Sequence, residues 1–237
     1  MDGSAGALRR LLIVNPNTNP AVTQLARQAA QRVLGPHTLA KVVQSAAGPL
    51  SIETFAHRQV AEPMTIEALS GHPGYDAYVV ACFDDIALRA ARGFLNAPVV
   101  GAAEAAIAVA RLHASRFAIV TTVETMVPGI RALIAGLGAT EICTVRATGV
   151  GVAAAAQVSD EVESRIAHAI ISARDIDGAG AIILGSGGLS GRAADLSRSF
   201  GLPVIDSIEA AIAMAEVAAR LSRPSRSPGA SDHTPGQ

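Results

Sequence analysis

Two small nucleophilic side chains, Cys82 and Ser186, each end a short apolar run, residues 78–81 and 182–185. Small or acidic residues follow each of them, and then a helical pattern begins. A buried parallel strand delivers a side chain in this way at its carboxyl end, beside the start of the next helix. Free backbone N–H groups and the helix dipole favour an anion there, so we expect the thiolate of Cys82 to be favoured. Cys82 is therefore a candidate base or nucleophile near neutral pH.

Less specific roles remain open for the residues around this motif. A lone cysteine most often serves as a small buried hydrophobic residue, and this is the role expected for Cys143. Asp84 and Asp85 suit the start of a helix as capping residues. Two carboxylates beside a thiolate would raise the pKa of Cys82 unless they point away from it.

The surroundings of the two nucleophiles repeat along the chain. Residues 98–108 read PVVGAAEAAIA and residues 203–213 read PVIDSIEAAIA, in corresponding places after Cys82 and Ser186. Residues 11–18 correspond in the same way to residues 117–122. The repeat predicts two similar α/β halves that face each other. Cys82 and Ser186 would then lie on opposite walls of one cleft, where open α/β sheets bind ligands.

Strand and helix patterns alternate, which favours largely parallel sheets. We predict an α/β protein with two Rossmann-like or flavodoxin-like halves, related by a pseudo-two-fold axis, and an active site in the cleft between them. The first half is expected over residues 11–112 and the second over 113–221, with the C-terminal helix able to pack across onto the first half. Residues 1–10 are expected to be a flexible lead-in. Residues 222–237, rich in Pro, Gly and polar residues, are expected to be a disordered tail.

Composition narrows the classes of partner. A net charge of −1 and an aromatic content of 3% offer neither an electrostatic footprint nor a stacking surface for nucleic acid. The same charge gives no attraction to an anionic membrane, and no apolar run reaches the roughly 20 residues that span a bilayer. The 2 cysteines and 6 histidines show no metal-ligand spacing, so no metal is expected. We therefore expect a small-molecule substrate and, because the cysteines suit a reducing compartment, a cytoplasmic location.

Four segments together resemble a known family. They are residues 15–18 (NPNT), 48–53 (GPLSIE), 81–85 (ACFDD) and 184–188 (LGSGG). In this order and spacing they resemble the aspartate/glutamate racemase superfamily and, within it, the hydantoin racemase branch. The resemblance covers nearly all of the chain between Leu11 and Leu221.

The resemblance implies proton transfer without a cofactor, at the carbon next to a carbonyl, between two cysteines on opposite faces of the substrate. One thiolate removes the proton and the opposite thiol returns one, while N–H groups and hydroxyls stabilise the developing enolate. It makes Cys82 and Ser186 the catalytic candidates. Turn and capping roles remain open for the Asn, Thr and Ser residues among the implied substrate contacts. These contacts are Asn17, Thr18, Ser51, Phe83, Asp84, Thr121, Thr122, Gly187 and Gly188.

Ser186 departs from the family pattern, because the branch carries its second cysteine at this place. A hydroxyl is a far weaker acid than a thiol, so it does not readily supply a base. Three explanations stay open: an engineered Cys-to-Ser variant, a natural relative with one base, or help for Ser186 from a neighbouring group.

The first hypothesis for function is therefore an isomerase that racemises 5-substituted hydantoins or allantoin. One alternative is a single-cysteine decarboxylase or cis-trans isomerase of the same superfamily. Another is a non-catalytic protein that binds small acids or ureides in the same cleft. In each case the apolar, Ala-rich helices predict a homo-oligomer.

Overall fold

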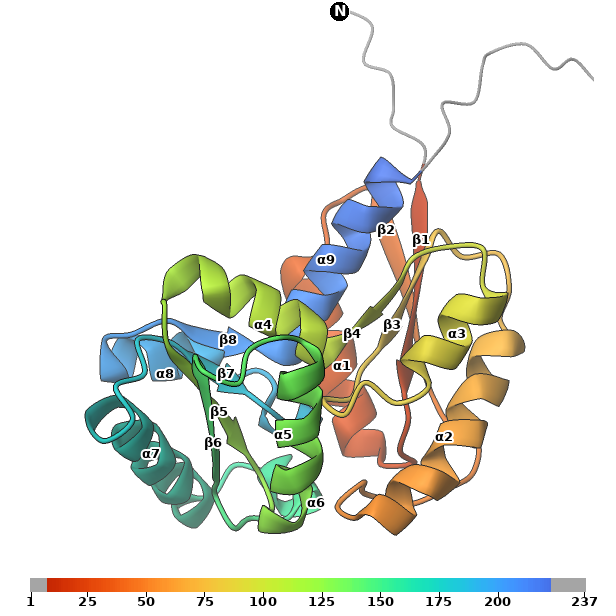
Figure 1. Ribbon diagram of the computed structural model, residues 1–237. Coiled ribbons are helices and arrows are strands. Elements are labelled where there is room, and N and C mark those ends of the chain that lie inside the picture. Colours follow the sequence, from red (N-terminus) through yellow and green to blue (C-terminus); the bar gives the residue numbers. More distant parts are fainter. Residues whose placement is uncertain (1–7, 223–237) are drawn as a thin grey trace, which may run out of the picture.

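The computed structural model describes residues 8–222, which form two four-stranded sheets. Every strand pair in both sheets is parallel. Each sheet and its helices make one lobe of the molecule (Figure 1). The predicted α/β class and the two similar parallel halves are confirmed. Most of the predicted flexible lead-in and nearly all of the predicted tail lie outside the described residues.

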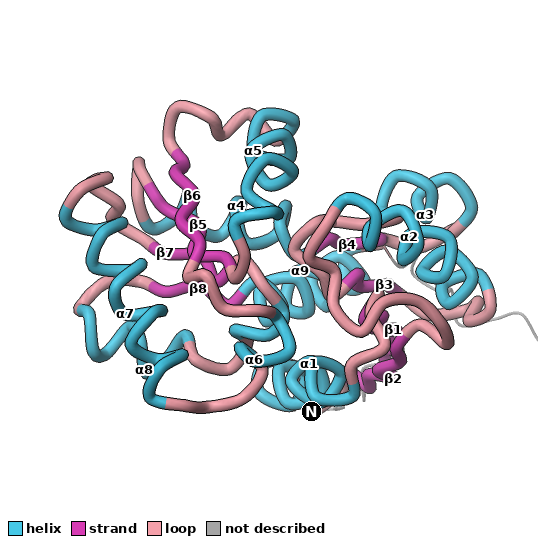
Figure 2. The backbone as a smooth tube through the Cα atoms, turned by 90° about the horizontal axis from the view of Figure 1, so that it is seen from below, coloured by secondary structure: helices cyan, strands magenta, loops and turns pink. Residues whose placement is uncertain are grey.

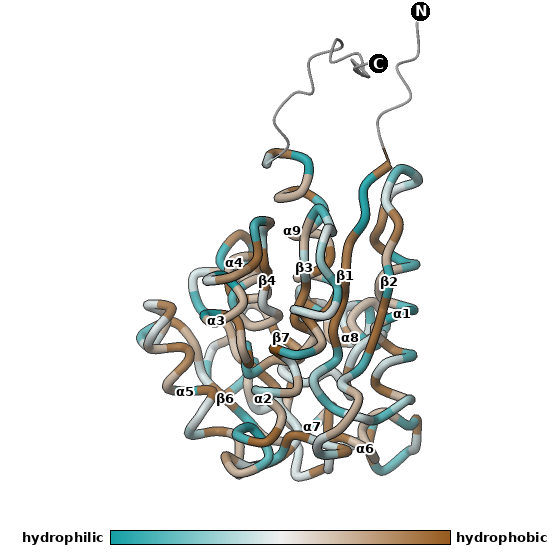
Figure 3. Tube along the Cα trace, turned by 90° about the vertical axis from the view of Figure 1, so that its right-hand side faces the viewer, coloured by the Kyte–Doolittle hydropathy of each residue, from teal (hydrophilic) through white to brown (hydrophobic). Residues whose placement is uncertain are grey.

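The first sheet has the strand order β2-β1-β3-β4, which is the order of a flavodoxin-like half. Residues Leu11 to Val14, in one of its two inner strands, are fully buried because helices cover both faces of the sheet. Figure 3 shows the strands of this sheet as largely hydrophobic. The elements are β1 (Arg9–Asn15), α1 (Pro20–Val33), β2 (Thr38–Gln44), α2 (Phe55–Ser70), β3 (Ala77–Val80), α3 (Leu88–Phe94), β4 (Val99–Gly101) and α4 (Ala102–His113).

The second sheet has the corresponding order β6-β5-β7-β8. Short helical segments follow β5, β6 and β7 before the chain turns back. The elements are β5 (Phe117–Thr121), η1 (Glu124–Met126), α5 (Val127–Gly136), β6 (Cys143–Ala147), α6 (Val152–Ala155), α7 (Asp160–Asp175), β7 (Ile182–Leu184), η2 (Gly187–Leu189), α8 (Ala193–Phe200), β8 (Val204–Asp206) and α9 (Ser207–Leu221).

The strand registers show that the two nucleophiles occupy equivalent positions. Val14 pairs with Val80 in the first sheet, and Val120 pairs with Leu184 in the second. Cys82 lies two residues after Val80 of β3, and Ser186 lies two residues after Leu184 of β7. The sequence repeat therefore reflects a repeat in three dimensions.

Helices α4 and α9 join the two halves. They lie side by side where the lobes meet (Figure 1), and the view from below shows them between the two sheets (Figure 2). Helix α9 ends the chain of the second half but packs against β1, β3 and β4 of the first sheet, whereas α4 reaches β7 and β8 of the second. One hydrophobic cluster accordingly contains residues from both sheets.

One strand boundary and one helix differ from what the sequence pattern favours. Strand β1 begins at Arg9, two residues before the predicted start of the first half. Helix α2 runs without a break through Pro63, a residue type that usually interrupts a helix. Pro63 and Gln59 are both exposed, so water can solvate the carbonyl that loses its intrahelical partner. None of the helices within residues 8–222 is both long and apolar enough to cross a membrane.

Replacing Ile212 by Ala should lower the free energy of unfolding by about 2–5 kcal/mol. Ile212 is 0% exposed and lies in the cluster shared by both sheets, so the shorter side chain leaves a cavity there. Urea unfolding followed by circular dichroism measures the change. Val217→Ala on the same helix is the matched control, because Val217 is 44% exposed and its truncation should have an effect within about 0.5 kcal/mol. Equal effects of the two changes would contradict the packing described for α9.

Candidate active site

A cleft between the two halves contains both nucleophiles. It holds about 490 Å³ of empty space, part of it open to solvent. The first half contributes the loops after β1, β2 and β3, and the second half contributes those after β5, β6 and β7. The lining residues are Asn17, Val22, Ile52, Ala81, Cys82, Phe83, Asp84, Thr121, Thr122, Met126, Ile130, Val152, Gly185, Ser186 and Gly187.

The loop that carries Cys82 and the loop that carries Ser186 approach each other closely at two glycines. A Cβ atom placed on Gly187 would lie 3.8 Å from the backbone oxygen of Ala81. One placed on Gly185 would lie 3.5 Å from the Phe83 ring and only 2.4 Å from Cγ2 of Ile119. The contacts with Ala81 and Phe83 are of ordinary van der Waals length, whereas the short distance to Ile119 shows that Gly185 is needed for the Ser186 loop to pack against β5 of its own half.

Cys82 does not lie at the start of a helix, which corrects the expectation of a favoured thiolate. Helix α3 begins only at Leu88, six residues further along the chain. Burial, and after it the charge of Asp84, raise the pKa of Cys82 to about 12, outweighing a hydrogen bond from the Asp84 backbone N–H that lowers it. Cys82 is therefore a neutral thiol at neutral pH.

Asp84 is a buried carboxylate in the wall of the cleft. Its side chain is 5% exposed and pairs with Arg58 of α2, whose Nη1 lies 3.4 Å from Oδ2 and 3.5 Å from Oδ1. Burial raises the pKa of Asp84, and Arg58 opposes this shift. Oδ2 accepts no hydrogen bond from the described residues. Asp84 does not cap a helix, so of the two predicted capping carboxylates only Asp85 has that role.

Ser186 follows Gly185, the first residue beyond the end of β7, and is 7% exposed. Its hydroxyl oxygen accepts a hydrogen bond from the Gly188 backbone N–H at 3.3 Å, so Ser186 caps the short helical segment η2. This segment packs against α1 of the first half and against α6. The wall around Ser186 therefore includes residues from both halves.

Asn17 presents hydrogen-bond donors to the cleft. Its Oδ1 accepts hydrogen bonds from Asn15 Nδ2 and from the Asn19 backbone N–H, both at 2.9 Å. Since both partners are donors, the amide orientation is fixed, and the Asn17 Nδ2 group has no partner among the described residues. Asn15, which is 0% exposed and also donates to Thr23, orients Asn17 from beneath.

The two threonines after β5 differ in their bonding. The Thr121 hydroxyl donates to the Gly185 carbonyl at 3.1 Å and so fixes the strand end that carries Ser186. The Thr122 hydroxyl lines the cleft and has no hydrogen-bond partner within residues 8–222. Thr122 is therefore the better placed of the two to donate to a ligand.

Three of the predicted contact residues are not part of the cleft wall. Thr18 instead fixes a neighbouring loop, because its hydroxyl and its backbone N–H both donate to the Pro49 carbonyl, at 3.3 and 3.1 Å. Ser51 is half-buried outside the wall, and its neighbour Ile52 lines the cleft. Gly188 packs against α6, where an added Cβ would lie 2.6 Å from the Val152 carbonyl oxygen.

Sequence reasoning missed the apolar part of the wall and one bridge across the cleft. The apolar residues carry no distinguishing motif, and only the approach of the two halves brings them together; they are Val22, Ile52, Met126, Ile130 and Val152. Glu53 forms the bridge. Its Oε1 accepts from the Val152 N–H at 2.7 Å, and its carbonyl accepts from the Thr125 hydroxyl at 2.6 Å. Glu53 thus connects the loop after β2 to the second half.

Comparison with known proteins identifies the family. A family model described as Asp/Glu/Hydantoin racemase matches residues 11–215. The chain belongs to this family. A hydantoin racemase from Rhizobium meliloti is 38% identical over 207 residues, 86% of either chain. One from Paenarthrobacter aurescens is 34% identical over 212 residues, 87% of this chain and 89% of that one.

Solved structures agree with this assignment. An allantoin racemase from Klebsiella pneumoniae superimposes with a TM-score of 0.86 at 36% identity, covering 90% of this chain and 88% of that one. A glutamate racemase from Campylobacter jejuni, 16% identical with a TM-score of 0.59, shares the fold. The predicted superfamily and its hydantoin racemase branch are confirmed. Racemases are isomerases, so the predicted enzyme class is confirmed as well.

Replacing Asp84 by Asn should make Cys82 react severalfold faster with iodoacetamide at pH 8. The charge of Asp84 is the largest cause of the raised Cys82 pKa after burial, and the thiolate is the reactive species. In the unchanged protein the rate should keep rising with pH towards the pKa of about 12. Mass spectrometry of the Cys82 peptide measures the rate.

Two controls accompany this experiment. Cys143 is a buried thiol outside the cleft, and its alkylation in the same digest should not change. Asp195→Asn removes an acidic group whose side chain is 78% exposed and should leave Cys82 unaffected. An unchanged or slower reaction of Cys82 in Asp84→Asn would show that Asp84 does not hold the thiol in its neutral form.

Proposed function

We propose that this protein is a cofactor-independent racemase of 5-substituted hydantoins or of allantoin, a hydantoin whose substituent is a ureido group. The observation that carries the proposal is the equivalent placement of Cys82 and Ser186, two residues beyond Val80 and Leu184, on the wall of one cleft. The similarity to hydantoin racemases and to an allantoin racemase supports it.

The ring of such a substrate matches the donors of the cleft. The proton at carbon 5 lies next to a carbonyl, and its removal places negative charge on the carbonyl oxygen. The Asn17 amide and the Thr122 hydroxyl have donors without protein partners among the described residues. Fixed donors of this kind stabilise an enolate more strongly than water does, because they need no reorganisation during the reaction.

Cys82 and Ser186 serve the two faces of the ring. The small fraction of Cys82 that is ionised at neutral pH acts as the base: this thiolate removes the proton on its face, becomes a thiol and later loses the proton to solvent. The Ser186 hydroxyl donates a proton to the opposite face, and the resulting alkoxide recovers a proton from water. The Gly188 N–H bonded to the Ser186 oxygen offsets part of the alkoxide charge. In the other direction Ser186 must act as the base, which is harder for a hydroxyl than for a thiol.

Replacing Ser186 by Cys should raise the rate of racemisation by roughly 10²-fold or more, the usual gain from a well-matched acid or base. Polarimetry with each enantiomer of 5-benzylhydantoin and of allantoin measures the rate. Cys143→Ala removes a thiol outside the cleft and should leave the rate unchanged. A Ser186→Cys variant that is no faster than the unchanged protein would contradict a catalytic role for position 186.

Proton NMR in heavy water tests the proposal on the unchanged protein. The enantiomer whose carbon 5 proton faces Cys82 should exchange that proton faster than it inverts, because deuterium returns from the same side. Chiral chromatography of the same samples measures inversion. Exchange and inversion at equal rates for both enantiomers would show that Ser186 works as well as a second thiol.

Replacing Cys82 by Ala should lower exchange of the carbon 5 proton by roughly 10²–10⁴-fold, since it removes the only thiol in the cleft wall of the described residues. Circular dichroism checks that the variant is folded. Retained exchange in Cys82→Ala would refute the mechanism. Absence of exchange in the unchanged protein would instead favour the decarboxylase, cis-trans isomerase or binding hypotheses, which malonate, maleate and thermal-shift assays distinguish.

A further inference from the structure

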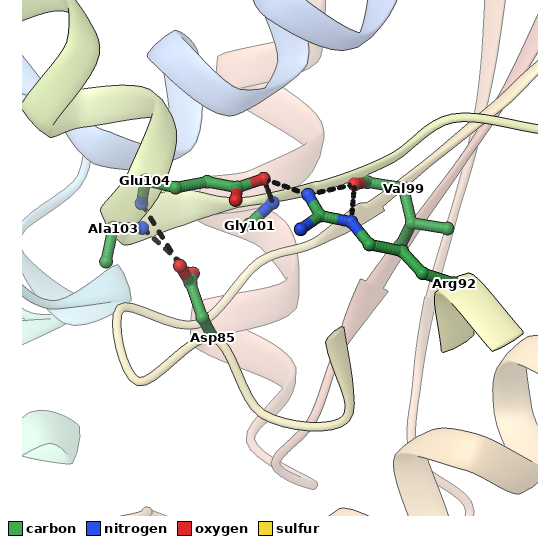
Figure 4. A network of polar contacts seen from close by, with 6 residues as sticks. All are labelled: Asp85, Arg92, Val99, Gly101, Ala103 and Glu104. Atoms are coloured by element: carbon green, nitrogen blue, oxygen red, sulfur yellow. Dashed lines mark hydrogen bonds and ion pairs between the residues drawn. The ribbon is translucent and has the colours of Figure 1, made fainter. Parts of the chain in front are cut away.

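Asp85 connects the Cys82 loop to a helix that lies much later in the chain. Its Oδ1 accepts a hydrogen bond from the Ala103 N–H at 2.9 Å, and its Oδ2 accepts one from the Glu104 N–H at 3.1 Å (Figure 4). These N–H groups belong to the first turn of α4, which has no partner for them within the helix. The predicted capping role of Asp85 is therefore real, but it serves α4 and not the adjacent α3.

Gly101 explains why a distant carboxylate can cap this helix. Gly101 is the residue before α4, and it has no side chain with which to cap it. A Cβ atom on Gly101 would lie 2.3 Å from Oδ1, 2.4 Å from Cγ and 2.7 Å from Oδ2 of Asp85, and it would meet no other side chain or backbone among its nearest contacts. The Asp85 carboxylate thus occupies the space of the missing side chain.

The second half also has a carboxylate at the start of the equivalent helix, but there the strand end carries it and not the loop. Gly101 pairs with Val80, and Asp206 pairs with Leu184, so Asp206 is the equivalent of Gly101. Oδ1 of Asp206 caps α9 through the N–H groups of Ile208 and Glu209, at 2.9 and 3.2 Å.

Asp206 also fastens the loop that carries Ser186. Its Oδ2 accepts from the Ser190 hydroxyl at 2.8 Å and from the Gly191 N–H at 2.6 Å. In the first half the carboxylate comes from the loop and reaches the helix, whereas in the second half it comes from the strand end and reaches the loop. The connection between loop and helix is the same in both.

We propose that Asp85 is a positioning residue that holds Cys82 in the geometry for proton transfer, by fastening the Cys82 loop to the start of α4. This inference rests on the function proposed above for the cleft. Asp206 has the matching role for the Ser186 loop. The catalytic residues themselves remain Cys82 and Ser186, since Asp85 does not line the cleft.

The backbone of the Cys82 loop needs such a fastening. Asp85 and Ala87 have φ angles of 45° and 60°, in the left-handed region that residues other than glycine rarely adopt. Surrounding contacts must therefore hold these residues in place. Ala87 contributes by packing with Ile52 and Ile86 in a small buried cluster, and the two hydrogen bonds of Asp85 add a polar anchor.

A second carboxylate nearby is kept separate from this anchor. Glu104 accepts from the Gly101 N–H at 3.1 Å and pairs with Arg92 of α3, which also donates to the Val99 carbonyl at 2.8 and 3.1 Å (Figure 4). Arg92 thereby balances the charge of Glu104. The two N–H groups of the first turn remain available to Asp85.

Moving the carboxylate from the loop to the strand end tests the proposal. Asp85→Ser alone removes the anchor, and Gly101→Asp alone introduces a side chain where Asp85 already lies. The double variant Asp85→Ser with Gly101→Asp rebuilds the second-half arrangement, in which a strand-end carboxylate accepts from a loop serine. Gly101 has a φ of −92°, so its backbone accommodates a side chain.

Two readouts are measured for the three variants. The first is the alkylation rate of Cys82 by iodoacetamide, which needs no substrate. The second is the separate determination of kcat and KM for racemisation of 5-benzylhydantoin. Each single change should raise the alkylation rate severalfold and lower kcat by at least about tenfold with little change in KM, since the thiol is misplaced while the cleft still binds. In the double variant, the alkylation rate and kcat should both return most of the way to their values in the unchanged protein.

The outcomes separate this inference from the proposed function. A return of the Cys82 alkylation rate in the double variant to the slower rate of the unchanged protein supports the anchor, even where no substrate is turned over. Unchanged alkylation in Asp85→Ser, or a double variant no better than the worse single one, overturns it. If Asp85→Ser does not fold, recovery of folded protein by the second change supports the anchor, and failure to recover overturns it. Asp195→Ser, at an exposed site, is the control and should alter neither readout.

Discussion

The close approach of two strand-end loops is the constraint on which the rest of this structure depends. Gly185 and Gly187 of the Ser186 loop lie beside Phe83 and Ala81 of the facing loop. Each half supplies one of the two facing loops, so the distance across the site is set by how the two sheets are held together. Helices α4 and α9 hold them by packing across the junction. Core packing far from the cleft is therefore linked directly to the geometry of the reacting groups.

The same approach determines the chemistry of Cys82. Closing the walls around the thiol removes water, and burial is the largest cause of its raised pKa. No helix begins beside it to offset this effect, because the loop continues to Leu88. Asp84 adds negative charge, and Arg58 only partly neutralises it. Under the proposed function, the exclusion of water that favours stabilisation of the enolate thus also suppresses the thiolate that would generate it.

The repeat in the sequence was sufficient to predict the two halves, their parallel strands and the equivalence of Cys82 and Ser186, because strand-end residues keep their register when an α/β unit is repeated. The ionisation of Cys82 was predicted wrongly. It depends on where α3 begins, and the left-handed residues Asp85 and Ala87 delay that start in a way that no local pattern signals. The orientation of Asn17 was also beyond the sequence, since it follows from hydrogen bonds to neighbours that look like ordinary turn residues.

The two walls of the cleft are electrostatically unlike, and this gives the serine its significance. Cys82 and Ser186 each accept a hydrogen bond from the backbone N–H two residues later, but that residue is Asp84, with its carboxylate, after Cys82 and Gly188 after Ser186. Asp84 is the only acidic side chain among the described residues that line the cleft. An anion is therefore better supported at position 186 than at Cys82, which favours the alkoxide that forms when Ser186 donates its proton in the proposed reaction. A thiol at position 186 would ionise more readily than the Cys82 thiol, so under the proposed mechanism serine at this place weakens the reaction most in the direction that needs a base there.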